Sequence, residues 1–188
     1  SIAITEPEAG SDAAGIATRA VRTDQGWILN GGKYFVSDGL YSDFFVVSAV
    51  TDPEAQPRHI SLFLVDKALP GVRVGQDQKM MGLTGSSHVE LFFDDVQLGP
   101  DTLIGGEGNG LRLALTALGR VRLAQVGARA IGKASRLLGY MADYANQRVQ
   151  FGKNIGQFQL IQEMLADSAI EINRSRLLLH RAAYALDA

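Results

Sequence analysis

The sequence changes character at a glycine-rich stretch near residue 100, and this change limits the possible folds more than any other feature. Before the stretch, short runs rich in Val, Ile and Phe are bounded by Gly, Pro, Asp or Asn, which is typical of β-strands. After it, apolar residues recur three and four positions apart, which is typical of helices. The stretch itself, residues 98–110, contains five glycines and a proline. We therefore predict an α+β chain, with a β-domain over residues 1–106 and a helical domain over residues 107–188.

The first part is expected to consist of several short strands. A turn at residues 23–26 (TDQG) separates the first two, and residues 51–58 form a polar loop with two prolines. Short strands at this spacing favour a barrel or a sandwich. The segments that read as strands are residues 15–22, 27–30, 33–37, 43–50, 59–66, 71–74 and 88–96.

Two long helices are predicted in the second part, over residues 111–148 and 158–188. Between them, residues 151–157 (FGKNIGQ) interrupt the helical pattern with two glycines. The chain begins with Ser1 at the edge of a strand-like run, and it stops at Ala188 inside a helical pattern without a Gly or Pro stop signal. We therefore expect an internal piece of a longer protein.

Composition excludes several classes of protein. The chain has 188 residues, of which 46% are apolar and 20% charged, and its mean hydropathy is +0.04, as in ordinary globular proteins. It has no cysteine, so a disulfide framework, a thiolate metal site and a cysteine nucleophile are excluded. No apolar run approaches the roughly 18 residues of a membrane span, and no signal peptide is seen. We expect a protein that is not secreted and has no membrane span.

Charge is unevenly distributed along the chain. Residues 1–100 hold 13 acidic and 7 basic side chains, whereas residues 101–188 hold 7 acidic and 11 basic ones, for a net charge of −2. This balance gives no overall attraction to nucleic acid, and no aromatic residues alternate with the basic ones of the helical part. We therefore expect no nucleic-acid partner. The three histidines, His59, His88 and His180, have no metal-ligand spacing and are expected to be structural.

The motif at residues 3–15 (AITEPEAGSDAAG) is polar and tightly composed, and it follows the apolar Ile2 directly. It resembles the first signature of the acyl-CoA dehydrogenases, flavoenzymes of fatty-acid and branched-chain oxidation. Three further segments resemble that family in the same order: Asn30–Gly39 (NGGKYFVSDG), Met81–Val96 (MGLTGSSHVELFFDDV) and Arg148–Gln159 (RVQFGKNIGQFQ). The resemblance implies a middle β-barrel domain followed by the long antiparallel helices of a partial four-helix bundle.

The resemblance also implies roles for residues at the beginning of the chain. Ile2, Ile4 and Thr5 would line the flavin ring of FAD, and the Thr5 hydroxyl and backbone would reach the N1/O2 edge. Ser11 would lie near the cofactor's pyrophosphate and the acyl-CoA substrate. Glu6 and Asp12 are expected to hold the loop together, because short polar side chains in turns bond local N–H groups.

In the second segment, the resemblance implies that Phe35 packs on the flavin and that the Ser37 hydroxyl points at N5, with Val36 counted among the cofactor contacts. Many family members have Trp and Thr in place of Phe35 and Ser37. The alternative for Phe35 is a plain core residue of a strand. Arg58, in the polar loop, is a weaker candidate for a CoA phosphate contact, and solvent exposure is the alternative.

In the last segment, the resemblance implies that Arg148, Gln150, Phe151 and Gln159 reach the FAD of a neighbouring subunit. Arginine offers a fork of donors for the pyrophosphate. The alternative for Arg148 is compensation of charge at a helix C-terminus. A cofactor site that needs two chains implies a homo-oligomer, a dimer or a tetramer.

The predicted function is that of an FAD-dependent acyl-CoA dehydrogenase of fatty-acid metabolism, in the bacterial cytoplasm or the mitochondrial matrix, with an electron-transferring flavoprotein as partner. The family removes the α-proton of an acyl-CoA with a carboxylate. No carboxylate lies between Glu107 and Asp143, so we expect no catalytic residue in this segment and a base beyond Ala188. The alternatives are an acyl-CoA oxidase, nitroalkane oxidase or flavin monooxygenase of the same fold, or a non-catalytic relative with an assembly role.

Overall fold

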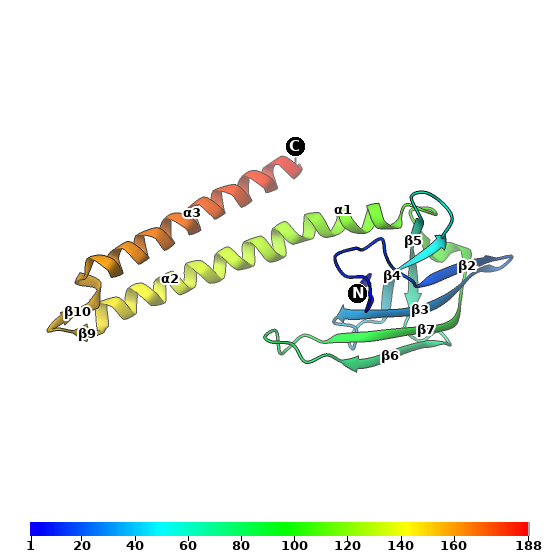
Figure 1. Cartoon of the computed structure of the whole chain (residues 1–188), viewed down its shortest axis with the longest axis horizontal. Helices are drawn as coiled ribbons and strands as arrows, with labels where there is room; N and C mark the ends of the chain where they lie inside the picture. Colours follow the sequence, from blue (N-terminus) through cyan, green and yellow to red (C-terminus); the bar gives the residue numbers. More distant parts are fainter. Residues whose placement is uncertain (188) are drawn as a thin grey trace. The chain divides into compact units, whose positions relative to one another are not determined.

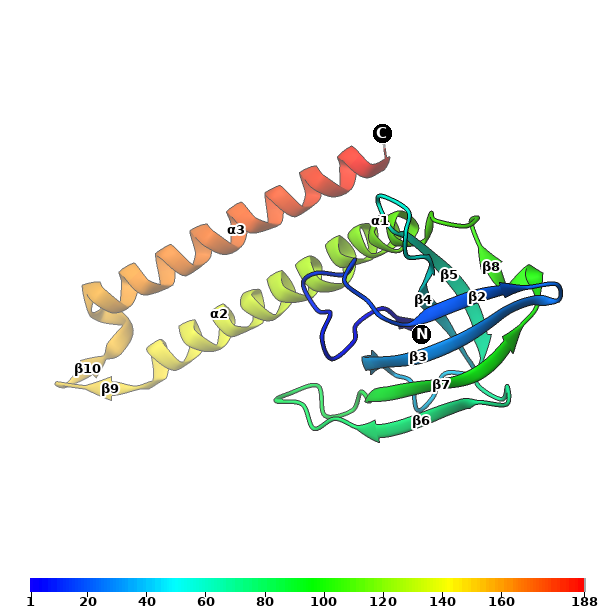
Figure 2. The same cartoon turned by 45° about the vertical axis from the view of Figure 1, so that its right-hand side comes forward.

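The computed structural model describes residues 1–187 and divides them into two compact units (Figures 1 and 2). The first unit comprises Ser1–Leu115 and contains a sheet, and the second runs from Thr116 onward and is helical. This is an α+β chain, as predicted. The predicted domain boundary after residue 106 stays a prediction.

The first unit is built on one mixed, eight-stranded sheet. Its strands are hydrogen-bonded in the order β6-β7-β3-β2-β4-β5-β8, and β1 adds to β4. β1 and β2 run parallel to β4, whereas the other pairs are antiparallel. The strands are β1 (Ile2–Ala3), β2 (Arg19–Thr23), β3 (Gly26–Ser37), β4 (Phe44–Asp52), β5 (His59–Asp66), β6 (Val72–Asp77), β7 (His88–Leu98) and β8 (Leu103–Ile104).

The sheet curls around its own core. Trp27 of β3 and Phe63 of β5 meet edge to face with ring centroids 5.3 Å apart, although β2 and β4 lie between these strands in the sheet. However, no pairing between the end strands β6 and β8 is found in the described residues. The predicted barrel is therefore not closed by hydrogen bonds here. β8 has only two residues, because the glycine- and proline-rich stretch around it does not sustain a longer ladder.

Most predicted strands are found close to their expected bounds, but residues 27–30 and 33–37 form one strand, β3, and the short strands β1 and β8 were not predicted. The start of β2 also differs. β2 begins at Arg19, whereas the sequence predicts a strand from Gly15. The backbone N–H groups of Ala17 and Thr18 donate instead to the side chain of Glu6, at 2.6 and 3.1 Å. These residues therefore belong to a loop that is fastened by a side chain.

The helical part of the chain, which begins with Gly110–Leu115 of the first unit and continues through the second, is a pair of long helices that lie side by side in opposite directions (Figures 1 and 2). α1 (Gly110–Arg122), a π-helical turn (Leu123–Ala128) and α2 (Arg129–Gln147) follow one another without a break. The predicted helix over residues 111–148 is thus found, but the π-helical turn was not foreseen. A short hairpin, β9 (Val149–Gln150) and β10 (Lys153–Asn154), then leads through a 3₁₀ turn (Ile155–Gln157) to α3 (Gln159–Asp187).

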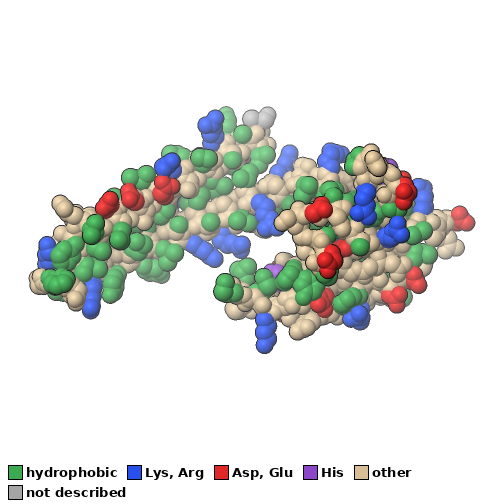
Figure 3. Space-filling model, viewed as in Figure 1, with side chains coloured by type: hydrophobic (Ala, Val, Ile, Leu, Met, Phe, Trp, Pro, Cys, Tyr) green, Lys and Arg blue, Asp and Glu red, His purple; other side chains and the backbone are tan. Residues whose placement is uncertain are grey.

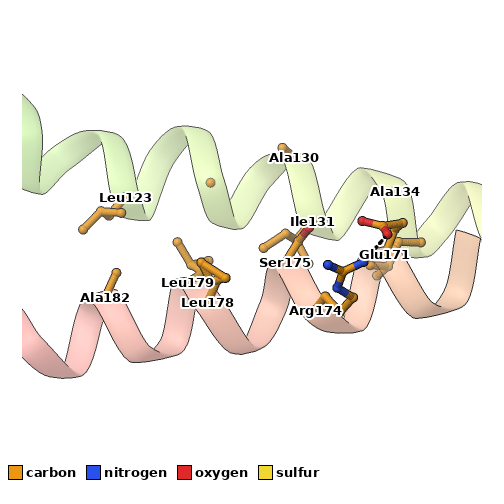
Figure 4. A pocket seen from close by; sticks show the side chains of 12 residues that line it. Leu123, Ala130, Ile131, Ala134, Glu171, Arg174, Ser175, Leu178, Leu179 and Ala182 are labelled. Carbon is orange, nitrogen blue, oxygen red and sulfur yellow. Dashed lines mark hydrogen bonds and ion pairs between the residues drawn. The ribbon is translucent and has the colours of Figure 1, made fainter.

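The helical unit leaves much of its apolar surface uncovered, as Figure 3 shows on its visible face. None of the described residues of α3 is fully buried, and Ala145 is the buried residue of α2. A groove of about 750 Å³ runs between the two helices, with Leu123, Ile131 and Leu179 among its lining residues (Figure 4). No helix of the described residues is long and apolar enough to cross a membrane.

The tight turn between β2 and β3 gives a test of the sheet. Gly26 has φ of +136°, and a Cβ there would collide with the Leu98 carbonyl oxygen of β7. We expect Gly26→Ala to cost about 2 kcal/mol or more of unfolding free energy. Gly132→Ala, in an open position of α2, is the control and should stabilise by up to about 1 kcal/mol. Urea unfolding measures both, and a neutral Gly26→Ala would contradict this packing.

Candidate functional site

The first five residues run beside the end of β3 in the opposite direction. The Ser1 hydroxyl donates to the Ser37 carbonyl at 2.6 Å, and the Tyr34 N–H donates to the Thr5 carbonyl at 2.7 Å. The structure therefore brings two of the predicted flavin segments together, although about 30 residues of sequence separate them. These segments are residues 2–5 and residues 35–37.

A β-bulge turns Phe35 out of the core. Lys33 pairs with Leu91, and the next pair is Val36 with Val89, so β3 holds one residue more than β7 between these pairs. Phe35 takes a left-handed backbone conformation, with φ of 54°, and its side chain is 46% exposed. It is therefore not the plain core residue of the alternative interpretation. A residue other than glycine in this conformation is uncommon and is often found at functional sites.

The bulge also decides which of its neighbours can face a ligand. Val36 is 2% exposed and belongs to the core, and its carbonyl accepts from the Gly39 N–H, so its side chain does not face a ligand. Ser37, the last residue of β3, is exposed. Opposite Ser37 lies His88 on β7, whose Nδ1 is buried without a hydrogen-bond partner among the described residues.

A buried ion pair holds the N-terminal loop, residues 4–18, on the sheet. The Lys33 ammonium donates to Glu6 Oε1 at 2.6 Å, to the Ile4 carbonyl at 3.1 Å and to the Ser48 hydroxyl at 3.1 Å. The Lys33 side chain has no exposed surface, and that of Glu6 is 7% exposed. Glu6 therefore holds the loop together rather than taking part in a reaction, as expected from the sequence.

Burial is the largest effect on the pKa of both members of this pair. It disfavours the charged form of Lys33, and although the hydrogen bond to Glu6 opposes it, the pKa of Lys33 is lowered from 10.5 to about 8. Burial would raise the pKa of Glu6, but hydrogen bonds from Lys33 and from the loop lower that pKa overall. Both groups are therefore charged near neutral pH.

The rest of the loop is a set of turns. Glu6 and Ala9 exchange two backbone hydrogen bonds of 3.1 Å, and Ser11 is exposed beyond them. The Arg58 guanidinium donates to the carbonyls of Ala14 and Ile16, each at 3.4 Å. Arg58 therefore braces the far end of the loop while remaining exposed, and its contact with CoA stays a prediction.

A second cluster surrounds the β9–β10 hairpin in the helical unit. Gln150, Phe151 and Gln159 line one cleft of about 790 Å³. The Phe151 side chain is 93% exposed and meets Phe158 edge to face at 6.2 Å. Arg148, also exposed, stands at the C-terminus of α2 and accepts a backbone hydrogen bond from Ile155. Three of the four residues predicted to contact a neighbour's FAD thus share one cleft.

Comparison with known proteins identifies the family. Residues 1–96 match the model "Acyl-CoA dehydrogenase, middle domain", and residues 108–188 match "Acyl-CoA dehydrogenase, C-terminal domain". The chain belongs to the acyl-CoA dehydrogenase family. The four motifs of the sequence therefore indicate the correct family.

Individual relatives agree with this assignment. A probable acyl-CoA dehydrogenase of Mycobacterium leprae is 42% identical over 183 residues, which are 97% of this chain and 47% of that protein. Butyryl-CoA dehydrogenase of Megasphaera elsdenii has a similar structure, with a TM-score of 0.89 at 37% identity over 97% of this chain and 48% of the other. A chain in the structure named "Electron transferring flavoprotein of Acidaminococcus fermentans" has a TM-score of 0.88 at 38% identity, over 97% of this chain and 48% of the other. The chain thus spans about half the length of each of these proteins.

Sequence reasoning missed Lys33, although a signal was present. Trp27, Leu29 and Lys33 follow the two-residue period of a strand, which places all three side chains on the inward face. A lysine in such a position needs a buried counter-charge, and Glu6 of the signature motif is that counter-charge. No pattern in the sequence predicts the buried, unpartnered Nδ1 of His88.

The buried pair gives a test that depends on pH. We expect Lys33→Met to lose about 3 kcal/mol or more of unfolding free energy near pH 7, because Glu6 would keep a buried charge alone. The advantage of the wild type should grow as pH rises from about 8 to 10.5. In this interval the unfolded chain binds more protons than the folded protein, so the free energy of unfolding increases with pH. Urea unfolding at several pH values measures the difference, and a flat or shrinking difference would contradict the lowered pKa of Lys33.

Proposed function

We propose that this chain is a segment of an FAD-dependent acyl-CoA dehydrogenase that oxidises the Cα–Cβ bond of an acyl-CoA thioester. The observation that carries the proposal is the meeting of residues 2–5 with the bulged end of β3. It puts an exposed aromatic side chain, Phe35, and an exposed hydroxyl, Ser37, next to the family's signature loop.

The donors on this surface fit the acceptors of a flavin. The Thr5 N–H donates to no other described residue. Thr5 follows the partly buried Ile4, and its carbonyl accepts from Tyr34, which precedes the exposed Phe35. In this proposal Ile2, Ile4 and Phe35 contact the ring, Thr5 donates to its pyrimidine edge, and Ser37 donates near N5. When bound, FAD supplies the hydride acceptor. Ser11 and Arg58 are the proposed contacts of this chain with the acyl-CoA.

The second cluster supports a cofactor site shared between two copies of the protein. In this proposal Arg148 and the cleft around Phe151 contact the FAD of a neighbouring subunit, so that the protein is a homodimer or homotetramer. The uncovered apolar surface of α2 and α3 is consistent with two helices of a four-helix bundle. In this proposal the curled sheet is most of a β-barrel domain that ends near residue 106.

The catalytic base is proposed to lie outside these residues. Proton abstraction from the α-carbon needs an acceptor such as a carboxylate, and no acidic side chain lies between Gly108 and Ala142. An electron-transferring flavoprotein is the proposed electron acceptor. The relatives compared above come from bacteria, which favours the bacterial cytoplasm over the mitochondrial matrix.

Anaerobic mixing of the full-length protein with a panel of acyl-CoA thioesters tests the function. We expect a yellow protein whose flavin absorbance is bleached by at least one thioester, because the substrate reduces the cofactor. Rapid hydrogen peroxide formation in air after bleaching would indicate an oxidase instead. A colourless protein that takes up no added FAD would contradict the proposal and favour a non-catalytic relative.

Arg148→Ala tests the shared site. An arginine–pyrophosphate contact is charge-assisted and worth about 1.5–3 kcal/mol, so FAD should bind about ten- to a hundredfold more weakly. Arg129→Ala, which removes an exposed arginine at the other end of α2, is the matched control and should leave FAD affinity unchanged. Fluorescence titration of the apoprotein measures both, and wild-type affinity in Arg148→Ala would refute the assignment.

A further inference from the structure

Three successive carbonyl groups, at the end of β1 and the start of the N-terminal loop, are held from the side of the sheet. The Ile4 carbonyl accepts from the Lys33 ammonium at 3.1 Å, and the Thr5 carbonyl accepts from the Tyr34 N–H at 2.7 Å. The Ala3 carbonyl accepts from the Ser48 hydroxyl, which itself accepts from Lys33. The orientation of the loop backbone is thus imposed by neighbouring side chains and by β3.

Because a peptide bond is planar, the fixed orientation of the Ile4 carbonyl also fixes the direction of the Thr5 N–H. In a planar trans peptide the carbonyl and the following N–H point to opposite sides. Because the Ile4 carbonyl points inward to Lys33, the Thr5 N–H points away from the core. The N–H of the next residue, Glu6, is already taken by the Ala9 carbonyl at 3.1 Å. Of these two neighbouring N–H groups, that of Thr5 is therefore the one that can donate to a ligand.

We propose that Lys33 is a positioning residue for the cofactor: by holding the Ile4 carbonyl, it aims the Thr5 N–H at the acceptor edge of the flavin. The inference rests on the proposed function and deepens it. Lys33 itself never touches the cofactor, since its side chain is wholly buried. All three of its N–H donors are engaged within the protein, by Glu6, Ile4 and Ser48.

This role is different from simple stabilisation. Glu6 neutralises the charge of Lys33 and fastens Ala17 and Thr18, so it serves stability. The hydrogen bond from Lys33 to the Ile4 carbonyl fixes the orientation of the Ile4–Thr5 peptide plane. Without Lys33, this carbonyl would lose the buried donor that turns it toward the core. A variant that restores charge balance without restoring this bond separates the two roles.

The test uses the full-length protein and two variants, Lys33→Met and the double variant Glu6→Gln/Lys33→Met. The double variant removes both buried charges, so it should recover stability relative to Lys33→Met. Both variants should bind FAD at least about tenfold more weakly, the equivalent of one lost hydrogen bond. The flavin reduction potential should be more negative in both, because the donor stabilises the charge that builds on the reduced ring.

Lys67→Met is the matched control. Lys67 also donates to backbone carbonyls, those of Leu40 at 2.7 Å and Gly39 at 3.5 Å, but in a different loop. It should leave FAD affinity and potential at wild-type values. A double variant with wild-type FAD affinity and potential would overturn the positioning role and leave Lys33 a structural residue. A wild-type protein that binds no FAD would instead overturn the proposed function on which the inference rests.

Discussion

The buried contact between Glu6 and Lys33 is the interaction on which the candidate site depends. A lysine ammonium and a carboxylate inside a protein are costly unless they are paired and fully hydrogen-bonded. Here each partner is used beyond the pair, since Lys33 also holds Ile4 and Ser48 while Glu6 holds Ala17 and Thr18. One ion pair therefore fastens both ends of the loop that carries the family's signature. The polar character of that motif is explained in part by these hydrogen bonds within the protein.

The backbone of β3 provides the other half of the site. The extra residue at the bulge changes which side chains face inward, from Lys33 before it to Val36 after it, and it leaves Phe35 on the surface. Within the bulge, the Tyr34 N–H donates to the Thr5 carbonyl of the loop. Strand and loop thus depend on each other, because the Tyr34 N–H of β3 and the Thr5 carbonyl of the loop are each other's hydrogen-bond partners.

Much of the fold follows from local pattern, whereas the site depends on contacts between distant residues. The strands and long helices follow from the two-residue and helical periods of the sequence, and the signature motif indicates the family. The late start of β2 was not predictable from local pattern, because Glu6 takes the N–H groups of residues 17 and 18. The positive φ of Phe35 was equally hidden, since no glycine marks that bulge. The barrel was inferred from the spacing of short strands and from the family resemblance, and neither specifies how the end strands pair.

A crystal structure of the FAD-bound, full-length protein tests the central claim most directly. The account predicts that the Lys33 ammonium contacts the Ile4 carbonyl and that the Thr5 nitrogen lies about 3 Å from the pyrimidine edge of the flavin, within hydrogen-bond distance. Phe35 should lie against the ring in the same structure. A flavin bound elsewhere, or an Ile4–Thr5 peptide turned so that its carbonyl faces the cofactor, would contradict it.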